Sequence, residues 1–401
     1  MRVLVMGGTQ FNGLALVHEL ARTGHQVVIL NRGQTKADLP HGVERVFADR
    51  TNHDQMRDVL GSVNVDAIID VSAYLPEDVE LMIEIFRGRI DHYVFISSTV
   101  IYAQSDHFPI TEAHPVERGD AQNPYGRNKL LCEDILLREW RENRFPCSIV
   151  PFSMVMGAGN ILPDREQRMF QRILRDRPIL IPGNGRTIQQ VGHADDQARA
   201  LRMMLCKPVT YGQRYNLTGN DYFTQEGYVD VFAGLLGKEV EKVFIPARMM
   251  DQLWSGDIEV ELPKTESKND IRAASGVSQV EINRFMLTML VQQIAPNIHY
   301  WDRSSLFSVD KLRRDVGWEP ELTFPASVER TWRWYQSAGL PDSQEFDFSF
   351  EDGLIKMARG WKEPIYRKAQ RPTPNRVARD DAPRSSDQRP LATSPCRLLR
   401  A

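Results

Sequence analysis

The stretch RVLVMGGTQFNG, residues 2–13, decides the fold of this chain. Its apolar run, Val3–Val5, is followed closely by glycine, which is typical of a strand buried on both faces of a parallel sheet. The glycines let the backbone turn tightly and come close to a pyrophosphate, while Gly13 lets the following helix pack against the strand. That helix, expected over Gly13–Thr23, would direct its free N–H groups and its positive end at the anion. The stretch therefore predicts a dinucleotide-binding turn.

The next 140 or so residues alternate between strand and helix patterns. Helices are expected around His53–Leu60 and Tyr125–Trp140. Strands that alternate with helices of this length imply right-handed βαβ crossovers and a parallel sheet. The expected fold is thus α/β, a Rossmann-type doubly wound parallel sheet. Its further strands are expected at Val27–Leu30, Val43–Phe47, Ala67–Val71, Tyr93–Ser97 and Ser148–Val150.

After Val150 the pattern becomes irregular, with glycine-rich turns and a polar stretch at residues 263–269. Two helices are expected there, Gln197–Leu205 and Gln279–Ile294. Ligands bind outside the carboxyl ends of strands in an open parallel sheet, so a smaller C-terminal lobe is expected to close over a substrate there. The predicted domains are a dinucleotide-binding domain at 1–155, a substrate lobe at 156–345 whose segments return to the sheet, an extra helix at 346–365 and a disordered basic tail at 366–401.

Composition excludes several classes of protein. Apolar residues make up 42% and charged residues 26% of the 401 residues, which is ordinary for a globular protein, and no apolar run is long enough for a membrane span. The first strand begins at once, so no targeting segment is expected. The four cysteines and nine histidines show no metal-ligand spacing, and a disulfide framework is not expected. We expect a cytoplasmic protein with no metal.

Charge is divided unevenly along the chain. From Arg367 onward, eight arginines and one lysine face three aspartates, a balance of +6, so the preceding part carries −9 of the total net charge of −3. An acidic body is a poor nucleic-acid binder, because phosphate contacts need clustered Lys and Arg. The tail also holds five prolines and is expected to be a disordered, solvated appendage. A basic arm that binds a protein partner is the alternative.

The choice of dinucleotide depends on the end of the second strand. NAD-binding proteins usually carry Asp or Glu there to bind the ribose 2′-hydroxyl, but this chain has Asn31-Arg32. Arg32 could face a 2′-phosphate, which favours NADP over NAD, while a solvent-exposed arginine is the alternative. Asp49, after the third strand, is placed to accept a hydrogen bond from the adenine amino group, although an aspartate of a simple turn would look the same.

Residues suited to hydride-transfer chemistry follow the fifth strand. Oxidising an alcohol requires a group that takes the hydroxyl proton, and tyrosine does so well when a nearby cation lowers its pKa from about 10. Tyr125 and Lys129 are four apart and share a helix face, and no other tyrosine of the chain has a lysine four residues later. Ser98, at the end of the strand, could bind the reacting hydroxyl and orient Tyr125. These three residues are the predicted catalytic set.

Ordered motifs along residues 1–340 resemble the extended short-chain dehydrogenase/reductase family, which contains nucleotide-sugar epimerases and dehydratases. The resemblance implies a Rossmann domain with a small C-terminal substrate lobe, often a homodimer through two helices per subunit. It also implies Ser98, Tyr125 and Lys129 as the catalytic residues. The motifs are GGTQFNG at 7–13, ISSTVIY at 96–102, NPYGRNK at 123–129, GAG at 157–159, VGHADD at 191–196 and VGWEP at 316–320.

Several positions depart from that family's pattern. Gln10 replaces the usual middle glycine, a variant that resembles the branch of the chloroplast stem-loop-binding proteins, some of which bind RNA. Pro151-Phe152 replaces the usual Arg-Pro, so contacts beneath a nicotinamide are expected to differ. Gln189 and Gln190 stand where many members place an arginine that grips a diphosphate, and Arg186 could substitute for it. Thr99 and Val100 lack the acidic side chains of dehydratases and decarboxylases, which disfavours both reactions.

Two function classes remain from the sequence. The first is an NAD(P)-dependent epimerase or reductase that acts on a hydroxyl of a sugar, nucleotide-sugar or nucleoside. The second is an RNA-binding or regulatory protein on the same fold. The residues expected to contact the dinucleotide are Gly7, Thr9, Gln10, Phe11, Gly13, Asn31, Arg32, Asp49, Ser72, Ser97, Tyr125, Lys129 and Phe152, and those expected near the substrate are Thr99, Asn160 and Arg186.

Overall fold

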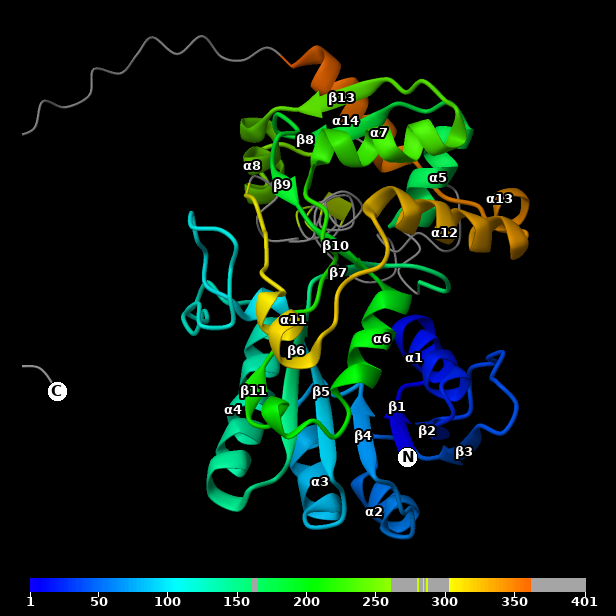
Figure 1. The fold of residues 1–401 in the computed structure, drawn as a ribbon. Coiled ribbons are helices and arrows are strands. Elements are labelled where there is room, and N and C mark those ends of the chain that lie inside the picture. Colours follow the sequence, from blue (N-terminus) through cyan, green and yellow to red (C-terminus); the bar gives the residue numbers. More distant parts are fainter. Residues whose placement is uncertain (161–164, 261–279, 281–283, 285, 288–302, 362–401) are drawn as a thin grey trace, which may run out of the picture. The chain divides into compact units, whose positions relative to one another are not determined.

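A computed structural model describes residues 1–160, 165–260, 280, 284, 286–287 and 303–361 of the chain (Figure 1). The expected helix at Gln279–Ile294, apart from four single residues, and the polar stretch at 263–269 lie outside the described residues, as does the expected basic tail. Residues Met1–Gly360 form one compact unit. The division of that unit into two domains at residue 155 stays a prediction.

A seven-stranded sheet forms the centre of the first half of the chain, in the order β11-β6-β5-β4-β1-β2-β3. Every pairing in this sheet is parallel, which confirms the predicted doubly wound Rossmann-type sheet. The chain leaves β1 toward β2 on one side, and β4 then pairs on the other side of β1, so the carboxyl ends of β1 and β4 flank a crevice. The strands are β1 (Arg2–Met6), β2 (Gln26–Asn31), β3 (Glu44–Phe47), β4 (Ala67–Asp70), β5 (His92–Ser98), β6 (Cys147–Phe152) and β11 (Gln213–Arg214).

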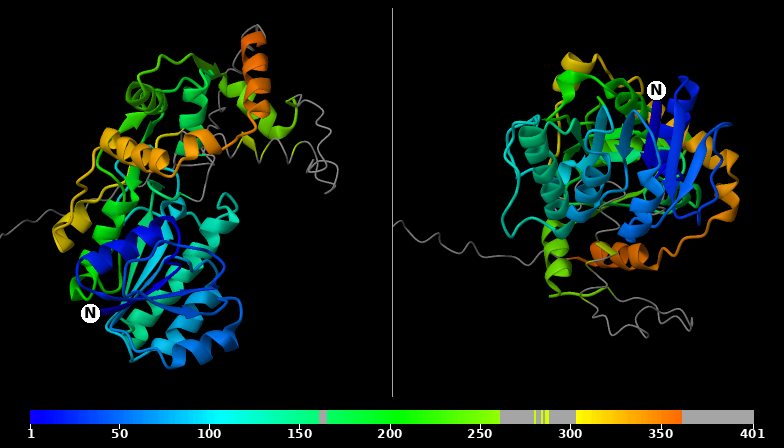
Figure 2. Two further views of the ribbon diagram at one scale, coloured as in Figure 1. Left: turned by 90° about the vertical axis from the view of Figure 1, so that its right-hand side faces the viewer. Right: turned by 90° about the horizontal axis from the view of Figure 1, so that it is seen from below.

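Alternate side chains of the strands pack into two separate cores, one on each face of the sheet. Val3 and Val5 belong to the core that α1 and α6 cover, whereas Leu4 and Met6 belong to the core of α2, α3 and α4. The two helical layers are visible in Figure 2. Because both faces are buried, the central strands β1, β2 and β4 are largely continuous apolar runs, whereas the edge strands β3 and β11 are more polar. The helices are α1 (Phe11–Arg22), α2 (His53–Gly61), α3 (Pro76–Phe86), α4 (Pro124–Asn143) and α6 (Ala194–Met204).

Helix α3 did not appear among the expected elements. Its buried side chains recur at helical spacing, with Val79, Met82, Ile83 and Phe86 facing the sheet, and Pro76 occupies its first turn. Proline suits that position because the N–H it lacks would have no partner inside the helix. This segment is the crossover that makes β4 and β5 parallel neighbours.

The later segments build a smaller lobe beyond the carboxyl ends of the sheet strands (Figure 1). Three two-stranded sheets pair β7 (Met154–Met156) with β10 (Val191–His193), β8 (Ile179–Pro182) with β13 (Lys242–Ile245), and β9 (Ile188–Gln189) with β12 (Phe223–Thr224). An aromatic core that includes Phe170, Tyr228 and Phe324 joins the helices around them. These helices include α5 (Glu166–Leu174), α7 (Gln225–Leu236), α8 (Ala247–Ser255), α12 (Phe324–Ser337) and α14 (Ser349–Gly360), with α11 (Asp310–Val316) and α13 (Leu340–Ser343) flanking α12 in the chain.

Candidate active site

The turn between β1 and α1 has the geometry of a phosphate-binding loop. Gly7 has a φ of +91°, and a Cβ on Gly13 would lie 2.0 Å from the carbonyl oxygen of Gly7, so both positions require glycine. Helix α1 begins at Phe11 without a side-chain cap from Gln10. The first N–H groups of the helix are therefore available to an anion.

A cavity of about 600 Å³ opens over this turn, at the carboxyl ends of β1, β2, β3 and β4. Its size and position suit the adenosine diphosphate part of a dinucleotide at the switch point of the sheet. Ser97, Tyr125, Lys129 and Phe152 do not line it. The predicted residues that do line it are Gly7, Thr9, Gln10, Phe11, Gly13, Asn31, Arg32, Asp49 and Ser72.

The end of β2 presents Arg32 as an exposed cation at the rim of this cavity. Asn31 is held from behind, since its Oδ1 accepts hydrogen bonds from the backbone N–H of Gly33 and from Arg45. Asp49 accepts hydrogen bonds from the backbone and the hydroxyl of Thr51, and these lower the pKa of the Asp49 carboxyl. One carboxylate oxygen of Asp49 is thus used in a local turn, while its contact with adenine stays a prediction.

A buried ion pair between Arg50 and Asp70 underlies the cavity and was missed from the sequence. The Nη2 of Arg50 lies 2.5 Å from Oδ2 of Asp70, which also accepts a hydrogen bond from Tyr93 at 2.8 Å. Burial raises the pKa of Asp70, but the charge of Arg50 and these hydrogen bonds outweigh it and hold the pKa below its usual value. The Nε and Nη1 atoms of Arg50 are buried without a hydrogen-bond partner, and Arg50 lines the cavity. This arginine can therefore offer donors to a ligand.

Local sequence explains how α4 presents Tyr125. The Oδ1 of Asn123 accepts the backbone N–H of Gly126 and caps the helix, and Pro124 occupies the first turn. Tyr125 follows at the very start of the helix, 43% exposed, with its ring stacked on that of Tyr74 at 5.6 Å between centroids. The site thus presents a partly exposed phenol that stacks on Tyr74, a residue of the cavity lining.

Ser98 and Lys129 lie on two sides of Tyr125. A hydrogen bond joins the side chains of Ser98 and Tyr125. The Nζ of Lys129 lies 5.7 Å from the centre of the Tyr125 ring and donates hydrogen bonds to the carbonyls of Ala73 and Ile96. Burial lowers the pKa of Lys129 to about 8. The structure therefore brings the three predicted catalytic residues together.

The electrostatic effect on Tyr125 differs from the expected one. Although the ring is partly exposed, desolvation raises the pKa of Tyr125 above its ordinary value, and the hydrogen bond from Ser98 and the charge of Arg165 only oppose this. Lys129 does not contribute to the shift, because its ammonium faces the ring and two carbonyl groups instead of the phenol oxygen. The expected acidification of Tyr125 by Lys129 and the charge of a nicotinamide therefore stays a prediction for the cofactor-bound protein.

Two further predicted dinucleotide residues have other partners. The hydroxyl of Ser97 is buried and donates a hydrogen bond of 2.5 Å to Glu133, which in turn pairs with Arg214. Phe152 is buried at the end of β6. Neither lines the described cavity, so their contact with a dinucleotide stays a prediction.

The three predicted substrate residues occupy different surroundings. Thr99 follows Ser98 directly in a short 3₁₀ turn, and it is partly exposed. The amide nitrogen of Asn160 lies 3.0 Å from both carboxylate oxygens of Glu166, inside the protein. Arg186 is exposed on the turn after β8. Thr99 alone among them adjoins a predicted catalytic residue, Ser98, in the chain.

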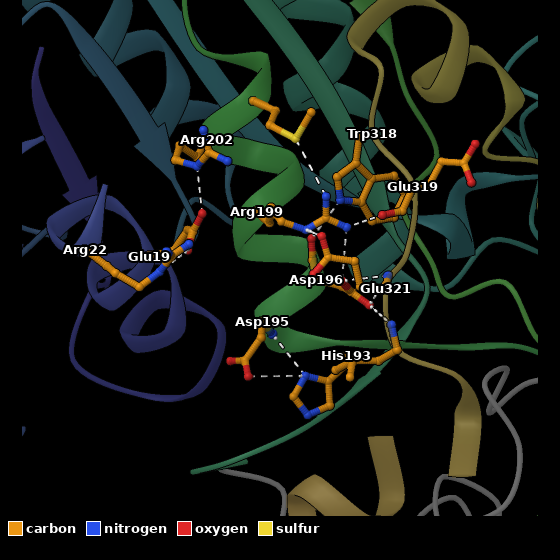
Figure 3. Close-up of polar contacts among 12 residues, drawn as sticks. Glu19, Arg22, His193, Asp195, Asp196, Arg199, Arg202, Trp318, Glu319 and Glu321 are labelled. Atoms are coloured by element: carbon orange, nitrogen blue, oxygen red, sulfur yellow. Dashed lines mark hydrogen bonds and ion pairs between the residues drawn. The ribbon is translucent and has the colours of Figure 1, made fainter. Parts of the chain in front are cut away.

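The motif at residues 191–196 holds the returning chain in place (Figure 3). The carboxylate of Asp196 accepts the backbone N–H groups of Glu321 and Leu322, and the indole of Trp318 donates to the backbone carbonyl of Asp196. His193 caps α6 by accepting the N–H of Asp195. This motif is accordingly structural and joins α6 to the segment before α12.

Two negative findings apply to the described residues. They include no group of three or more His, Cys, Asp or Glu side chains that could hold a metal ion. Among the same residues, no helix has the length and apolar character needed to cross a membrane.

A family model described as the NAD dependent epimerase/dehydratase family matches residues 3–218 of the chain. Among curated proteins, the chain is 29% identical over 239 residues to chloroplast stem-loop binding protein of 41 kDa b from Arabidopsis thaliana, a match that covers 56% of this chain and 61% of that protein. It is 25% identical over 250 residues to 2′-dehydrokanamycin reductase from Streptomyces kanamyceticus, covering 62% of this chain and 70% of the reductase. The match thus spans less than two thirds of the chloroplast protein's length.

Among solved structures, the chain resembles dTDP-glucose 4,6-dehydratase from Bacillus anthracis in complex with NAD. The TM-score is 0.62 at 18% identity, over 84% of this chain and 97% of the dehydratase. At that identity the likeness shows the fold: a Rossmann-type sheet with a second lobe.

Proposed function

This chain belongs to the NAD dependent epimerase/dehydratase family, and from that premise we propose that it is an NAD(P)-dependent oxidoreductase or epimerase that acts on a hydroxyl group of a sugar, nucleotide-sugar or nucleoside. Tyr125 is the acid–base in this proposal. Ser98 orients the reacting hydroxyl, and Lys129 holds the nicotinamide side of the cofactor.

One observation carries the proposal: Ser98, Tyr125 and Lys129 converge at the carboxyl edge of the sheet, where the glycine turn also lies and α1 begins without a side-chain cap. Two of these residues come from one helix turn and the third from the end of β5. A chance Tyr-x-x-x-Lys pair on a surface helix would not carry a lysine buried against the carbonyls of two neighbouring strands.

The residues present fit a dinucleotide. The turn at Gly7–Gly13 leaves no room for a Cβ at its last position and offers unpaired helix N–H groups to a pyrophosphate. Arg32 at the rim of the cavity favours the 2′-phosphate of NADP, since the second strand ends without Asp or Glu. A bound nicotinamide would supply the hydride acceptor or donor.

The chain's own residues would then move the proton. Tyr125 Oη would take the proton from the substrate hydroxyl during oxidation and return it during reduction. Desolvation raises the pKa of Tyr125 above its ordinary value, so the reaction needs a positive charge near the phenol to lower it again. Ser98, hydrogen-bonded to Tyr125, would keep the substrate hydroxyl and the phenol oxygen in line for the proton transfer. The ammonium of Lys129 has one further hydrogen to donate, because two of its three are used in hydrogen bonds to backbone carbonyls.

An RNA-binding function is the second candidate, because one curated relative is named for stem-loop binding. The net charge of −9 on the residues before the tail opposes it. One measurement distinguishes the two functions: mass spectrometry can identify the nucleotide that copurifies with the full chain. Tightly held NAD indicates epimerisation, and an empty site that fills with NADPH and quenches protein fluorescence indicates a reductase. Salt-sensitive RNA binding without any dinucleotide binding would contradict the proposal.

A further inference from the structure

Arg165 is a partly exposed arginine that has no carboxylate partner among the residues that the structure describes. Its Nη1 donates a hydrogen bond of 3.1 Å to the carbonyl of Val155, while its Nε is buried and has no hydrogen-bond partner. The adjacent carboxylate, Glu166, is bound by the amide of Asn160. None of the residues that the structure describes forms an ion pair with Arg165 within 4.0 Å.

This arrangement contrasts with the next arginine on the same helix. Arg168 is buried, and its guanidinium makes hydrogen bonds of 2.6 and 2.7 Å to the two carboxylate oxygens of Glu351. Burial without such a partner lowers the pKa of Arg165. The charge of Glu166 opposes this shift, but the Nε of Arg165 stays without a hydrogen-bond acceptor. A buried donor without an acceptor is costly to keep, so a bound ligand is expected to complete the site.

Arg165 links the predicted catalytic tyrosine to the smaller lobe. It directly precedes α5, and its charge interacts with Glu166, with Tyr228 of α7 and with Tyr125 of α4. The hydroxyl of Tyr228 is buried without a hydrogen-bond partner. A guanidinium nitrogen and a hydroxyl without partners thus lie on the lobe side, and the charge of Arg165 reaches the phenol of Tyr125.

We propose that Arg165, assisted by the hydroxyl of Tyr228, binds a negatively charged group of the substrate and holds it beside Tyr125. The inference rests on the proposed function and narrows the substrate to an acidic sugar derivative. Its anion is either a carboxylate on the sugar or a phosphate attached to it, and both offer the oxygen acceptors that a guanidinium fork prefers. A neutral sugar would leave the charge of Arg165 unpaired and would bind weakly.

Calorimetric titration of the full chain, saturated with NADP⁺, tests this proposal with UDP-glucuronate and UDP-glucose as probes. The variants are Arg165→Met, Tyr228→Phe and, as the matched control, Arg138→Met at an exposed position of α4. Arg165→Met should weaken UDP-glucuronate binding at least tenfold, Tyr228→Phe by a smaller factor, and Arg138→Met by less than twofold. If Arg165 binds the sugar carboxylate, the affinity for UDP-glucose is the same in Arg165→Met and wild type. If Arg165 binds the diphosphate, Arg165→Met loses affinity for both probes equally. Equal affinities of wild type and Arg165→Met for both probes would overturn the proposal.

A stability measurement separates this role from a structural one. Removing a charge that has no ion-pair partner among the described residues should leave the Tm of Arg165→Met unchanged or higher. Replacing a structural arginine such as Arg168 by methionine should instead lower the Tm by several degrees. A lower Tm for Arg165→Met would count against the proposal. The comparison of the two probes measures binding and does not depend on turnover. The proposal for Arg165 can therefore fail while Tyr125 still proves catalytic, so its failure is distinguishable from a failure of the proposed function.

Discussion

The ammonium nitrogen of Lys129, on α4, donates a hydrogen bond of 2.7 Å to the backbone carbonyl of Ala73, just beyond β4. A second hydrogen bond, of 2.8 Å, reaches the carbonyl of Ile96 in β5. The helix that carries Tyr125 is thereby tied to β5 and to the loop after β4 at the carboxyl edge of the sheet. The placement of the proposed catalytic phenol consequently depends on this backbone as well as on the helix spacing of four residues.

Replacing Lys129 should change how stability depends on pH. Burial lowers the pKa of Lys129 to about 8 from an ordinary value of 10.5, so between these pH values the unfolded chain holds more protons than the folded one. Wild-type stability should therefore rise with pH across this window, by up to about 3 kcal/mol relative to Lys129→Met. Urea unfolding at pH 7.5, 9 and 10.5 measures the difference. For the control Leu131→Met, on the same helix, the difference in unfolding free energy from wild type should be the same at all three pH values. A difference that is likewise independent of pH for Lys129→Met would contradict the burial of a charged amine.

Tyr125→Phe should abolish turnover while leaving the dinucleotide in place. Without the phenol oxygen the substrate proton has no acceptor, and the loss of an acid–base group costs roughly 10²- to 10⁴-fold in kcat. Steady-state kinetics and NADPH fluorescence titration measure the two effects. Tyr222→Phe, at a position that is 56% exposed, serves as the control and should behave as wild type. Full turnover by Tyr125→Phe would remove the acid–base role.

Gly13→Ala should damage both the fold and the dinucleotide site. The added Cβ would lie 2.0 Å from the Gly7 carbonyl oxygen, so the turn must shift. Overpacking of this kind destabilises by about 1–3 kcal/mol, and NADPH affinity should fall at least tenfold because the helix N–H groups move with the turn. Gly61→Ala is the matched control, since a Cβ there meets nothing within 4 Å. Unchanged NADPH binding by Gly13→Ala would show that the turn does not hold the phosphates.

Arg32→Ala tests the preference for NADP. A charged hydrogen bond to the 2′-phosphate is lost, so NADPH should bind roughly ten- to a hundredfold more weakly while NADH binding stays nearly constant. Competition titrations with both nucleotides give the ratio, and Lys36→Ala, a nearby cation outside the cavity lining, is the control. If NADH already binds wild type more tightly than NADPH, the preference inferred from Arg32 is wrong.

The sequence predicted those parts of the site that depend on local pattern. The turn at Gly7–Gly13 and the pair Tyr125–Lys129 are each contained in one short segment, so their spacing alone gives their geometry. The ion pair of Arg50 with Asp70 joins residues 20 positions apart and could not be read from either segment.

The same limit applies to the electrostatics of Tyr125. The charge of Arg165, 40 positions later in the chain, acts on the phenol of Tyr125, and this relationship has no signature in the sequence. The pKa of Tyr125 depends on burial and on such non-local charges, which is why helical spacing to Lys129 was an insufficient basis for predicting its direction.

Arg50→Met should be strongly destabilising, because it leaves the buried carboxylate of Asp70 without its cation. Breaking a buried pair on one side costs about 3–5 kcal/mol. The pKa of Asp70 lies below its ordinary value in wild type, so its contribution is present near neutral pH and is lost as the pH falls below about 4. Without Arg50, burial alone would raise that pKa, so the folded variant would take up a proton more readily. The difference in unfolding free energy between wild type and Arg50→Met should therefore become smaller as the pH falls from 7 to 4.

The double variant Arg50→Met/Asp70→Asn removes both charges and keeps the acceptor for Tyr93, whose hydroxyl donates to Asp70 in wild type. The double variant should recover more than half of the stability that Arg50→Met loses at pH 7. Its difference in unfolding free energy from wild type should not become smaller at pH 4 in the way expected for the single variant. Denaturant unfolding of the three chains at both pH values measures this. A single variant that loses less than about 1 kcal/mol would mean that the charges of Arg50 and Asp70 are solvated rather than paired in a dry site, because exposed pairs contribute that little.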